Sequence, residues 1–209
     1  MARQQTRFTV DTDITASHHN AALIGNTEGV VFQLDELGAP PVFDDAALDS
    51  LHTLGFTAIA GGNLDNILRI NVTDFSTFDL NLDGGGGFNT LSFAGSANGV
   101  TVDLSDRTTR TIDNFQQIIG TGFDDVIIGD DQPHVLDGGG GSNIIAGGAG
   151  DDIIYSGGGG SDLVDGGGGY NTLSYERAAT LLDNQGNPFG AIFDPLNGNV
   201  IYSLSGRGT

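Results

Sequence analysis

A nine-residue repeat is the feature that most restricts the fold of this chain. Four consecutive copies fit the frame Gly-Gly-x-Gly-x-(Asp/Asn)-x-aliphatic-x, and a fifth copy stands alone at 84–92. A flexible Gly-rich linker has no reason to place an aliphatic side chain at one fixed phase. The repeat therefore predicts a periodic fold with one very short strand per copy. The four consecutive copies cover 138–146, 147–155, 157–165 and 166–174, with Ser156 as an extra residue between the second and the third.

Two degenerate copies precede this block. The frame placed on 119–127 puts Asp124 at the sixth position with Asp125 beside it, and the frame on 129–137 puts His134 there after Pro133. A longer repeat is also visible, because the decapeptide that begins at Gly84 recurs almost unchanged from Gly166. In both places a variable stretch and a strand-like segment follow, at 99–104 and at 190–195, and 29–34 looks like a third version of this strand. The chain is therefore interpreted as about two and a half copies of one unit.

The nonapeptide resembles the signature of the RTX (repeat-in-toxin) calcium-binding proteins of bacteria, with a close match over 119–174. This resemblance implies an all-β fold, a right-handed parallel β-roll solenoid with two nonapeptides per turn and flanking irregular β segments. It also implies calcium ions between neighbouring loops, and export from the cell by a one-step type I machinery. A secreted, extracellular protein is therefore expected.

The repeat pattern divides the chain into four parts. We expect an N-terminal variable β segment over 1–60, a degenerate repeat unit over 61–118, the β-roll over 119–174, and a cap or the start of a further unit over 175–209. Within the first part, 44–54 predicts a short helix. Its expected inward side chains are Ala46, Ala47, Leu48, Leu51 and Leu54.

The acidic residues are almost all aspartate, with 24 Asp against 3 Glu in a chain of net charge −20. An acidic surface alone would use both residues freely, whereas turns and calcium loops need short carboxylates close to the backbone. Glycine at the first, second and fourth positions permits tight loops that expose carbonyl oxygens. Calcium is therefore the expected cofactor, with several ions between stacked loops.

Loops that follow each other along one edge of the roll should lie two repeats apart in sequence, because one turn takes two repeats. One edge holds the loops at Gly120, Gly138 and Gly157, and the other those at Gly129, Gly147 and Gly166. His134 is a poor ligand for a hard cation, which puts the 129 loop in doubt. The predicted ligands are Asp124, Asp125, Gly138, Gly140, Asn143, Gly147, Ala149, Asp151, Asp152, Gly157, Gly159, Asp162, Gly166, Gly168 and Asn171.

The seventh position of the repeat should face outward. It carries Val135, Ile144, Ile153 and Leu163. β-Branched and aliphatic residues suit exposed strands, so strand propensity explains them. A covered or self-associating face is the alternative.

Several functions are disfavoured. Seven arginines and no lysine cannot form the basic surface that a nucleic-acid binder needs. No cysteine is present, no apolar run approaches the roughly 20 residues of a membrane span, and no zinc-protease or lipase motif occurs. We expect no enzyme. The alternatives are a polysaccharide-binding or targeting domain of a secreted enzyme, such as an alginate epimerase, and an adhesin fragment. Only Arg69, Arg107 and Arg110 could contribute to a polyanion site.

Overall fold

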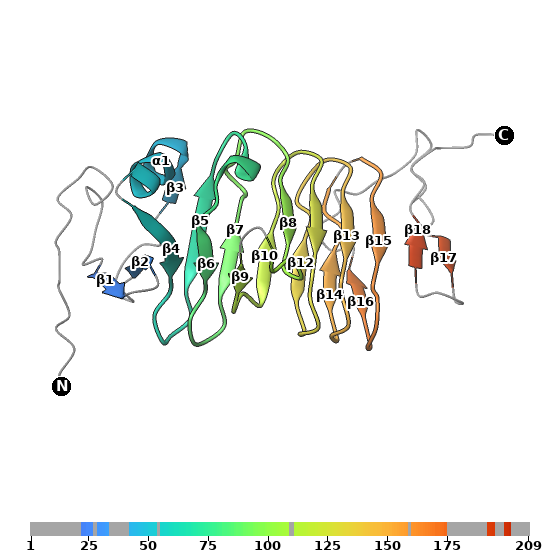
Figure 1. The fold of residues 1–209 in the computed structure, drawn as a ribbon. Coiled ribbons are helices and arrows are strands. Elements are labelled where there is room, and N and C mark those ends of the chain that lie inside the picture. Colours follow the sequence, from blue (N-terminus) through green and yellow to red (C-terminus); the bar gives the residue numbers. More distant parts are fainter. Residues whose placement is uncertain are drawn as a thin grey trace.

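The computed structural model describes residues 22–26, 29–33, 42–53, 55–108, 111–158, 160–174, 192–194 and 199–201. Within them, short strands form three sheets that lie along one axis as a parallel roll (Figure 1). This confirms the predicted all-β, parallel β-roll fold. Among the described residues, no helix is both long enough and apolar enough to cross a membrane.

The three sheets are named A, B and C. Sheet A contains β1 (Ala22–Asn26), β2 (Gly29–Gln33), β4 (Phe56–Ala60), β6 (Asn81–Asp83) and β9 (Ile112–Asp113). Sheet B contains β3 (Val42–Asp44), β5 (Ile67–Asn71), β7 (Thr90–Ser92), β10 (Gln117–Ile119), β12 (Val135–Asp137), β14 (Ile153–Tyr155) and β16 (Thr172–Ser174). Sheet C contains β8 (Thr101–Asp103), β11 (Val126–Ile128), β13 (Ile144–Ala146), β15 (Leu163–Asp165), β18 (Asn199–Ile201) and β17 (Ile192–Asp194).

From β10 onward the chain alternates between sheets B and C. Leu136 pairs with Ile118 on one side and with Ile154 on the other, so one rung of the roll takes two nonapeptides. The following rung is one residue longer, as the pairing of Ile154 with Leu173 shows. The additional residue is the insertion next to Tyr155. Residues 117–174 are called the repeat region. Each loop in it joins one sheet to the other and stacks on a loop two repeats away.

The rungs before β10 are longer. Leu91 pairs with Leu68 in the preceding rung and with Ile118 in the following one, and both intervals exceed two nonapeptides. The chain leaves β7 in sheet B, passes through β8 in sheet C and β9 in sheet A, and returns to sheet B at β10. Sheet A therefore ends, and sheet C begins, within this one rung. Residues 56–116 are called the long-turn region.

The repeat region buries one aliphatic side chain per strand. The side chain at the eighth position points inward, while its neighbour at the seventh position points out; Ile145 is 1% exposed and Ile144 is 48% exposed. Side chains thus alternate between the two faces of each strand, as in ordinary β-strands, and the eighth position faces inward as predicted. The inward residues are Ile127, Leu136, Ile145, Ile154 and Val164, with Leu173 partly buried.

The long-turn region adds a larger core. Its wider rungs enclose aromatic side chains, and the rings of Phe75 and Phe93 pack edge to face with centroids 4.6 Å apart. Phe75 begins the 3-10 helix η2 (Phe75–Thr77), and the Asp74 side chain caps it by accepting the Ser76 N–H at 2.9 Å. The hydroxyl of Ser96 is buried in the same rung, where it donates to the Ile70 carbonyl and accepts the Val72 N–H at 3.1 Å, so both backbone groups are paired.

A short helix covers one end of the roll near β3 and β4 (Figure 1). It is α1 (Asp45–Thr53), and Asp44 caps it by accepting the Ala47 N–H at 2.9 Å. Leu48 and Leu51 are buried as predicted, and Ala47 is half-buried. Ala46, predicted to face inward, is exposed because such a short helix turns only a narrow stripe toward the core. The predicted inward Leu54 lies outside the described residues.

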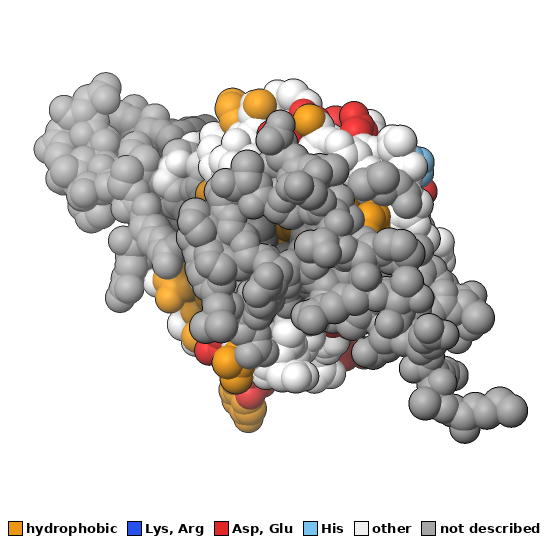
Figure 2. Space-filling view, turned by 90° about the vertical axis from the view of Figure 1, so that its left-hand side faces the viewer, with side chains coloured by type: hydrophobic (Ala, Val, Ile, Leu, Met, Phe, Trp, Pro, Cys, Tyr) orange, Lys and Arg blue, Asp and Glu red, His pale blue; other side chains and the backbone are white. Residues whose placement is uncertain are grey.

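Antiparallel strands occur at the two ends of the parallel ladder. β1 pairs with β2 before sheet A turns parallel, and β18 pairs antiparallel with β15 at the far end of sheet C. The strand-like segments predicted at 29–34 and 190–195 correspond to β2 and β17. Figure 2 looks along the roll from its N-terminal end, and the described surface visible there carries acidic side chains and histidine, with no arginine in view.

Candidate metal centre

The sixth repeat position lies inside the loops. Asp125, Asn143 and Asp152 are each 1% exposed, and Asp162 is 8% exposed. The pairing of Val126 with Ile144 and of Ile127 with Ile145 makes Asp125, not Asp124, the counterpart of Asn143. The frame expected for 119–127 is therefore wrong by one residue and begins at Gly120. Asp124 occupies the exposed fifth position instead.

On one edge of the roll, these inward side chains form a hydrogen-bond ladder. The backbone N–H of Val100 donates to Asp125 Oδ1 at 2.7 Å, that of Asp125 donates to Asn143 Oδ1 at 3.0 Å, and that of Asn143 donates to Asp162 Oδ1 at 2.8 Å. Each rung is therefore held by a side-chain oxygen of the next. Sequence reasoning missed this use of the sixth position; the restriction to Asp and Asn, both short oxygen acceptors, was the available signal.

The other edge carries the same ladder with a break in the middle. Asn66 N–H donates to Asn89 Oδ1, and Asn89 N–H donates to the Gln116 side-chain oxygen. After the 129–134 loop the ladder resumes, with donation from His134 N–H to Asp152 Oδ1 at 2.8 Å and from Asp152 N–H to Asn171 Oδ1 at 2.9 Å. The break falls at His134, whose ring replaces the short oxygen acceptor.

Fifth-position side chains fasten the loops in the opposite direction. Asp124 Oδ1 accepts the Ser142 N–H at 2.7 Å, and Asp151 Oδ1 accepts the Tyr170 N–H at 2.8 Å. Both carboxylates are exposed. One oxygen of each carboxylate is already bonded to a backbone N–H of the next rung. As a ligand, each carboxylate could therefore contact an ion between two loops only from the solvent side.

Stacked loops also bond main chain to main chain. The third-position N–H donates to a second-position carbonyl in the preceding rung, as from Gly140 to Thr121 at 2.8 Å, from Ala149 to Asp130 at 3.0 Å and from Gly168 to Gly148 at 2.8 Å. A carbonyl oxygen has two lone pairs, so each of these acceptors keeps one that a cation could use.

The insertion next to Tyr155 changes the loop frame. Gly138 N–H pairs with the Tyr155 carbonyl, and an added Cβ on Gly138 would meet the carbonyl of Ser156, so Ser156 takes the first loop position. Gly157 then takes the second position with a positive φ of 98°, not the first as expected. The predicted ligand Gly159 lies outside the described residues.

Asp152 carries the unmatched oxygen of the site. Its Oδ2 is buried and has no hydrogen-bond partner. A Cβ added to Gly147 would collide with this oxygen and with the carbonyl oxygen of Gly166, so the two oxygens converge beside the Gly147 α-carbon. Burial raises the pKa of Asp152 above the ordinary carboxyl value. Two oxygens that face each other without a hydrogen between them suit a hard cation.

Asp125 differs, because its loop supplies the donors. Its Oδ2 accepts the Thr121 N–H at 2.7 Å, and the Thr121 hydroxyl lies 2.9 Å from Oδ1. Burial raises the pKa of both Asp125 and Asp162. Asp162 has its Oδ1 matched by Asn143 N–H and lies in the last described loop of its edge.

The predicted amide ligands already have partners. Asn143 Nδ2 donates to the Ser156 carbonyl at 3.3 Å, and Asn171 Nδ2 donates to the carbonyls of Gly166 and Gly168 at 2.7 Å each. Their amide oxygens accept backbone N–H groups in the ladders. Both residues therefore line the loops in the predicted places, with each end of the amide already in a hydrogen bond.

His134 is tied to its own loop. The His134 Nε2 lies 2.9 Å from Asp130 Oδ1, the ring is buried, and Nδ1 has no partner. The loop therefore contains a nitrogen ligand where its neighbours have oxygen, which agrees with the expectation that it is a poor site for a hard cation.

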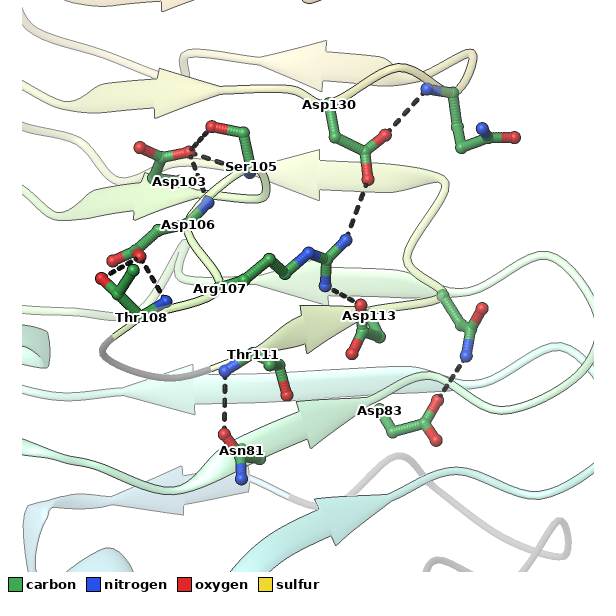
Figure 3. A network of polar contacts seen from close by, with 12 residues as sticks. Asn81, Asp83, Asp103, Ser105, Asp106, Arg107, Thr108, Thr111, Asp113 and Asp130 are labelled. Atoms are coloured by element: carbon green, nitrogen blue, oxygen red, sulfur yellow. Dashed lines mark hydrogen bonds and ion pairs between the residues drawn. The ribbon is translucent and has the colours of Figure 1, made fainter.

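A groove of about 660 Å³ lies beside this loop, next to the rung that contains β7, β8 and β9. Arg107 is one of its lining residues, and its guanidinium pairs with Asp113 and, at 3.5 Å, with Asp130 (Figure 3). Leu104, Ile112 and Phe115 line its apolar part. The only described arginine in the groove is thus neutralised by two carboxylates.

Among the described residues, no three His, Cys, Asp or Glu side chains gather into a metal site. An ion at Asp152 would therefore be held by that carboxylate together with main-chain carbonyls, Gly166 among them, and with water. This ligand set is all oxygen, as calcium requires. No protein-family model matches the chain, and no curated protein matches it.

Proposed function

We propose that this protein is a secreted calcium-binding β-roll of the RTX kind, without catalytic activity, whose repeat region folds when it binds extracellular calcium. The observation that supports the proposal most directly is the buried, unpartnered Oδ2 of Asp152 beside the Gly166 carbonyl. The resemblance of the nonapeptides to RTX repeats and the parallel roll agree with it.

The small core of the repeat region is the reason to couple folding to the ion. Each nonapeptide buries one aliphatic side chain, which contributes roughly 1.5–3 kcal/mol. Ordering the backbone of each repeat costs about 1–2 kcal/mol per residue in entropy, and glycine raises that cost. A ligand that binds only the folded state stabilises it in proportion to its concentration. Calcium is scarce inside cells and abundant outside, so the region would fold after export.

Calcium titration followed by circular dichroism tests this function. We expect the far-ultraviolet spectrum to change from coil toward β-structure as calcium rises, with a midpoint near the ~10⁻⁴–10⁻³ M typical of extracellular modules. Magnesium is the control, because it gives up its water ligands reluctantly and should leave the spectrum unchanged. Identical spectra in chelator and in calcium would contradict the proposal.

The polysaccharide alternative finds no support in the groove. A polyanion would need a free cationic side chain there, and Arg107 is already held by Asp113 and Asp130. Arg110 lies outside the described residues. Binding to alginate with and without calcium would test this alternative separately.

A further inference from the structure

The described sixth positions differ in whether the side chain can donate a hydrogen bond to the next rung. Where it is asparagine and another described rung follows, Nδ2 donates to the first-position carbonyl of that rung. The bonds run from Asn66 to Gly84 at 3.1 Å, from Asn89 to Asn114 at 2.8 Å, and from Asn143 to Ser156 at 3.3 Å. The amide nitrogen thereby pairs with a carbonyl oxygen that would have a second oxygen opposite it if the residue were aspartate.

An aspartate in the same place has no hydrogen to donate. At Asp152 the atom that corresponds to Nδ2 is Oδ2, which faces the Gly166 carbonyl and has no partner. Asp125 escapes this conflict through the two donors of Thr121. A buried oxygen without a donor destabilises the folded state, and a cation would relieve it.

We propose that the sixth-position amide is a built-in substitute for the cation, so that each rung is either ion-independent, with Asn, or ion-dependent, with an unassisted Asp. This inference rests on the proposed calcium function and adds where the ion acts. Cation dependence is then concentrated at the loop of Asp152, with Asp162 at the end of the described ladder as the second candidate. The rungs of Asn66, Asn89 and Asn143, and the Thr121-assisted rung of Asp125, need no ion at this position.

Exchanging amide and carboxylate in the full-length chain tests the inference. D152N would place a donor opposite the Gly166 carbonyl and keep the oxygen that accepts His134 N–H. N143D would remove the donor from the Ser156 carbonyl and create a new ion-dependent rung. Two controls change the charge at exposed positions that are not among the predicted ligands. D165N removes a charge and keeps an oxygen for Gly167 N–H, and S142D adds a charge next to Asn143 and keeps an acceptor for Ser161 N–H.

The readouts are thermal unfolding in chelator and in calcium, and the number of calcium ions bound by calorimetry. We expect D152N to be ordered in chelator, to lose one bound ion and to lose most of the calcium-induced stabilisation. We expect N143D to lower the folded-to-unfolded ratio in chelator by roughly 5- to 150-fold relative to S142D, and calcium to restore it. D165N should match the wild type in both readouts.

The failures of the two ideas can be told apart. If wild-type protein shows no calcium response, the proposed function is wrong, while N143D against S142D in chelator still decides whether the amide stabilises the rung. If wild-type protein responds to calcium but D152N responds equally, binds as many ions and is no more ordered in chelator, the inference is overturned and the proposed function stands. N143D with the stability of S142D in chelator would also overturn it.

Discussion

The long-turn region and the repeat region belong to one continuous roll but are filled differently. Among the described residues, 56–116 contribute fifteen buried hydrophobic side chains, against six in 117–174. Four of the fifteen are phenylalanines, whereas the six are all aliphatic. The longer rungs have room for a second layer of side chains, and the rungs of two nonapeptides do not. Apolar burial alone can thus sustain the first region far better than the second.

The buried polar side chains also differ between the long-turn region and the repeat region. The long-turn region closes its inner ladder with neutral amides, Asn66, Asn89 and Gln116. The repeat region uses three carboxylates among its sixth-position residues, and burial raises the pKa of each. The region with the smaller core therefore also carries the buried charges. This combination favours a pre-folded base on which an ion-dependent segment assembles.

The largest expected effect separates the two cores. Phe93→Ala should cost about 3–5 kcal/mol and lower the melting temperature in chelator and in calcium alike, because Phe93 packs on Phe75 in the long-turn region, which we expect to fold without an ion. Ile145→Ala should cost about 2–5 kcal/mol, visible only when calcium has folded the repeat region. Differential scanning calorimetry measures both. The control is Ile144→Ala on the outer face of the same strand, expected within about 0.5 kcal/mol of wild type.

The next largest expected effect is a gain in amide protection when calcium binds, measured by hydrogen exchange. With calcium at a hundred times its dissociation constant, the repeat region should gain about 2.7 kcal/mol, or roughly a hundredfold in amide protection. Residues 138–174 should show this gain, and residues 56–104 should show little, because their amides are held by a core that needs no ion. Mass spectrometry of peptides from the two regions measures it. Equal gains in both regions would mean that the roll folds as one unit and would contradict the expected difference between the two regions.

The repeat region was largely predictable because its signal is local and repeated. A fixed phase of Ile145, Ile154 and Val164 is enough to orient each strand, and two repeats per rung then stack the loops on two edges. The frame around Asp124 and Asp125 was not predictable from the adjacent pair alone. Only the pairing of Ile127 with Ile145 across the rung decides which carboxylate turns inward.

The long-turn region and the fate of individual carboxylates depend on non-local contacts. No local pattern says that the chain should visit sheets C and A between β7 and β10, since the connecting stretches are variable. Likewise, the help that Asp125 receives from Thr121 requires the loop to fold back on itself. Sequence predicted that oxygens gather in the loops, but the match between each oxygen and a donor becomes visible only once the rungs are stacked.

Loop glycines offer a smaller effect with a close control. Gly139 has a φ of 74°, and an added Cβ would collide with the Thr121 carbonyl of the preceding rung. Gly139→Ala should cost at least about 1–2 kcal/mol from the left-handed conformation alone. The matched variant is Gly122→Ala in the stacked loop, where an added Cβ meets nothing within 4 Å. Chemical denaturation in calcium compares them, and equal stabilities would contradict the loop stacking.

The smallest expected effect is a difference in pH dependence in chelator. Burial raises the folded-state pKa of Asp125, Asp152 and Asp162, so the folded repeat region holds protons more tightly than the unfolded chain. Their contribution is greatest below the ordinary carboxyl pKa of 3.8 and is lost as pH rises through the raised values. Acid should therefore partly replace calcium in this region.

The long-turn region should show the opposite sign. Hydrogen bonds from Ser76 lower the pKa of Asp74, so this carboxylate contributes stability above its ordinary pKa and loses it as pH falls through the lowered value. Amide exchange measured in chelator between pH 7 and pH 4, corrected for the intrinsic rate, resolves the two regions. D152N provides the control, because it removes one of the three raised groups and should weaken the acid stabilisation of 138–174. A repeat region that loses protection on acidification as the long-turn region does would show that its buried carboxylates are not what opposes folding without calcium.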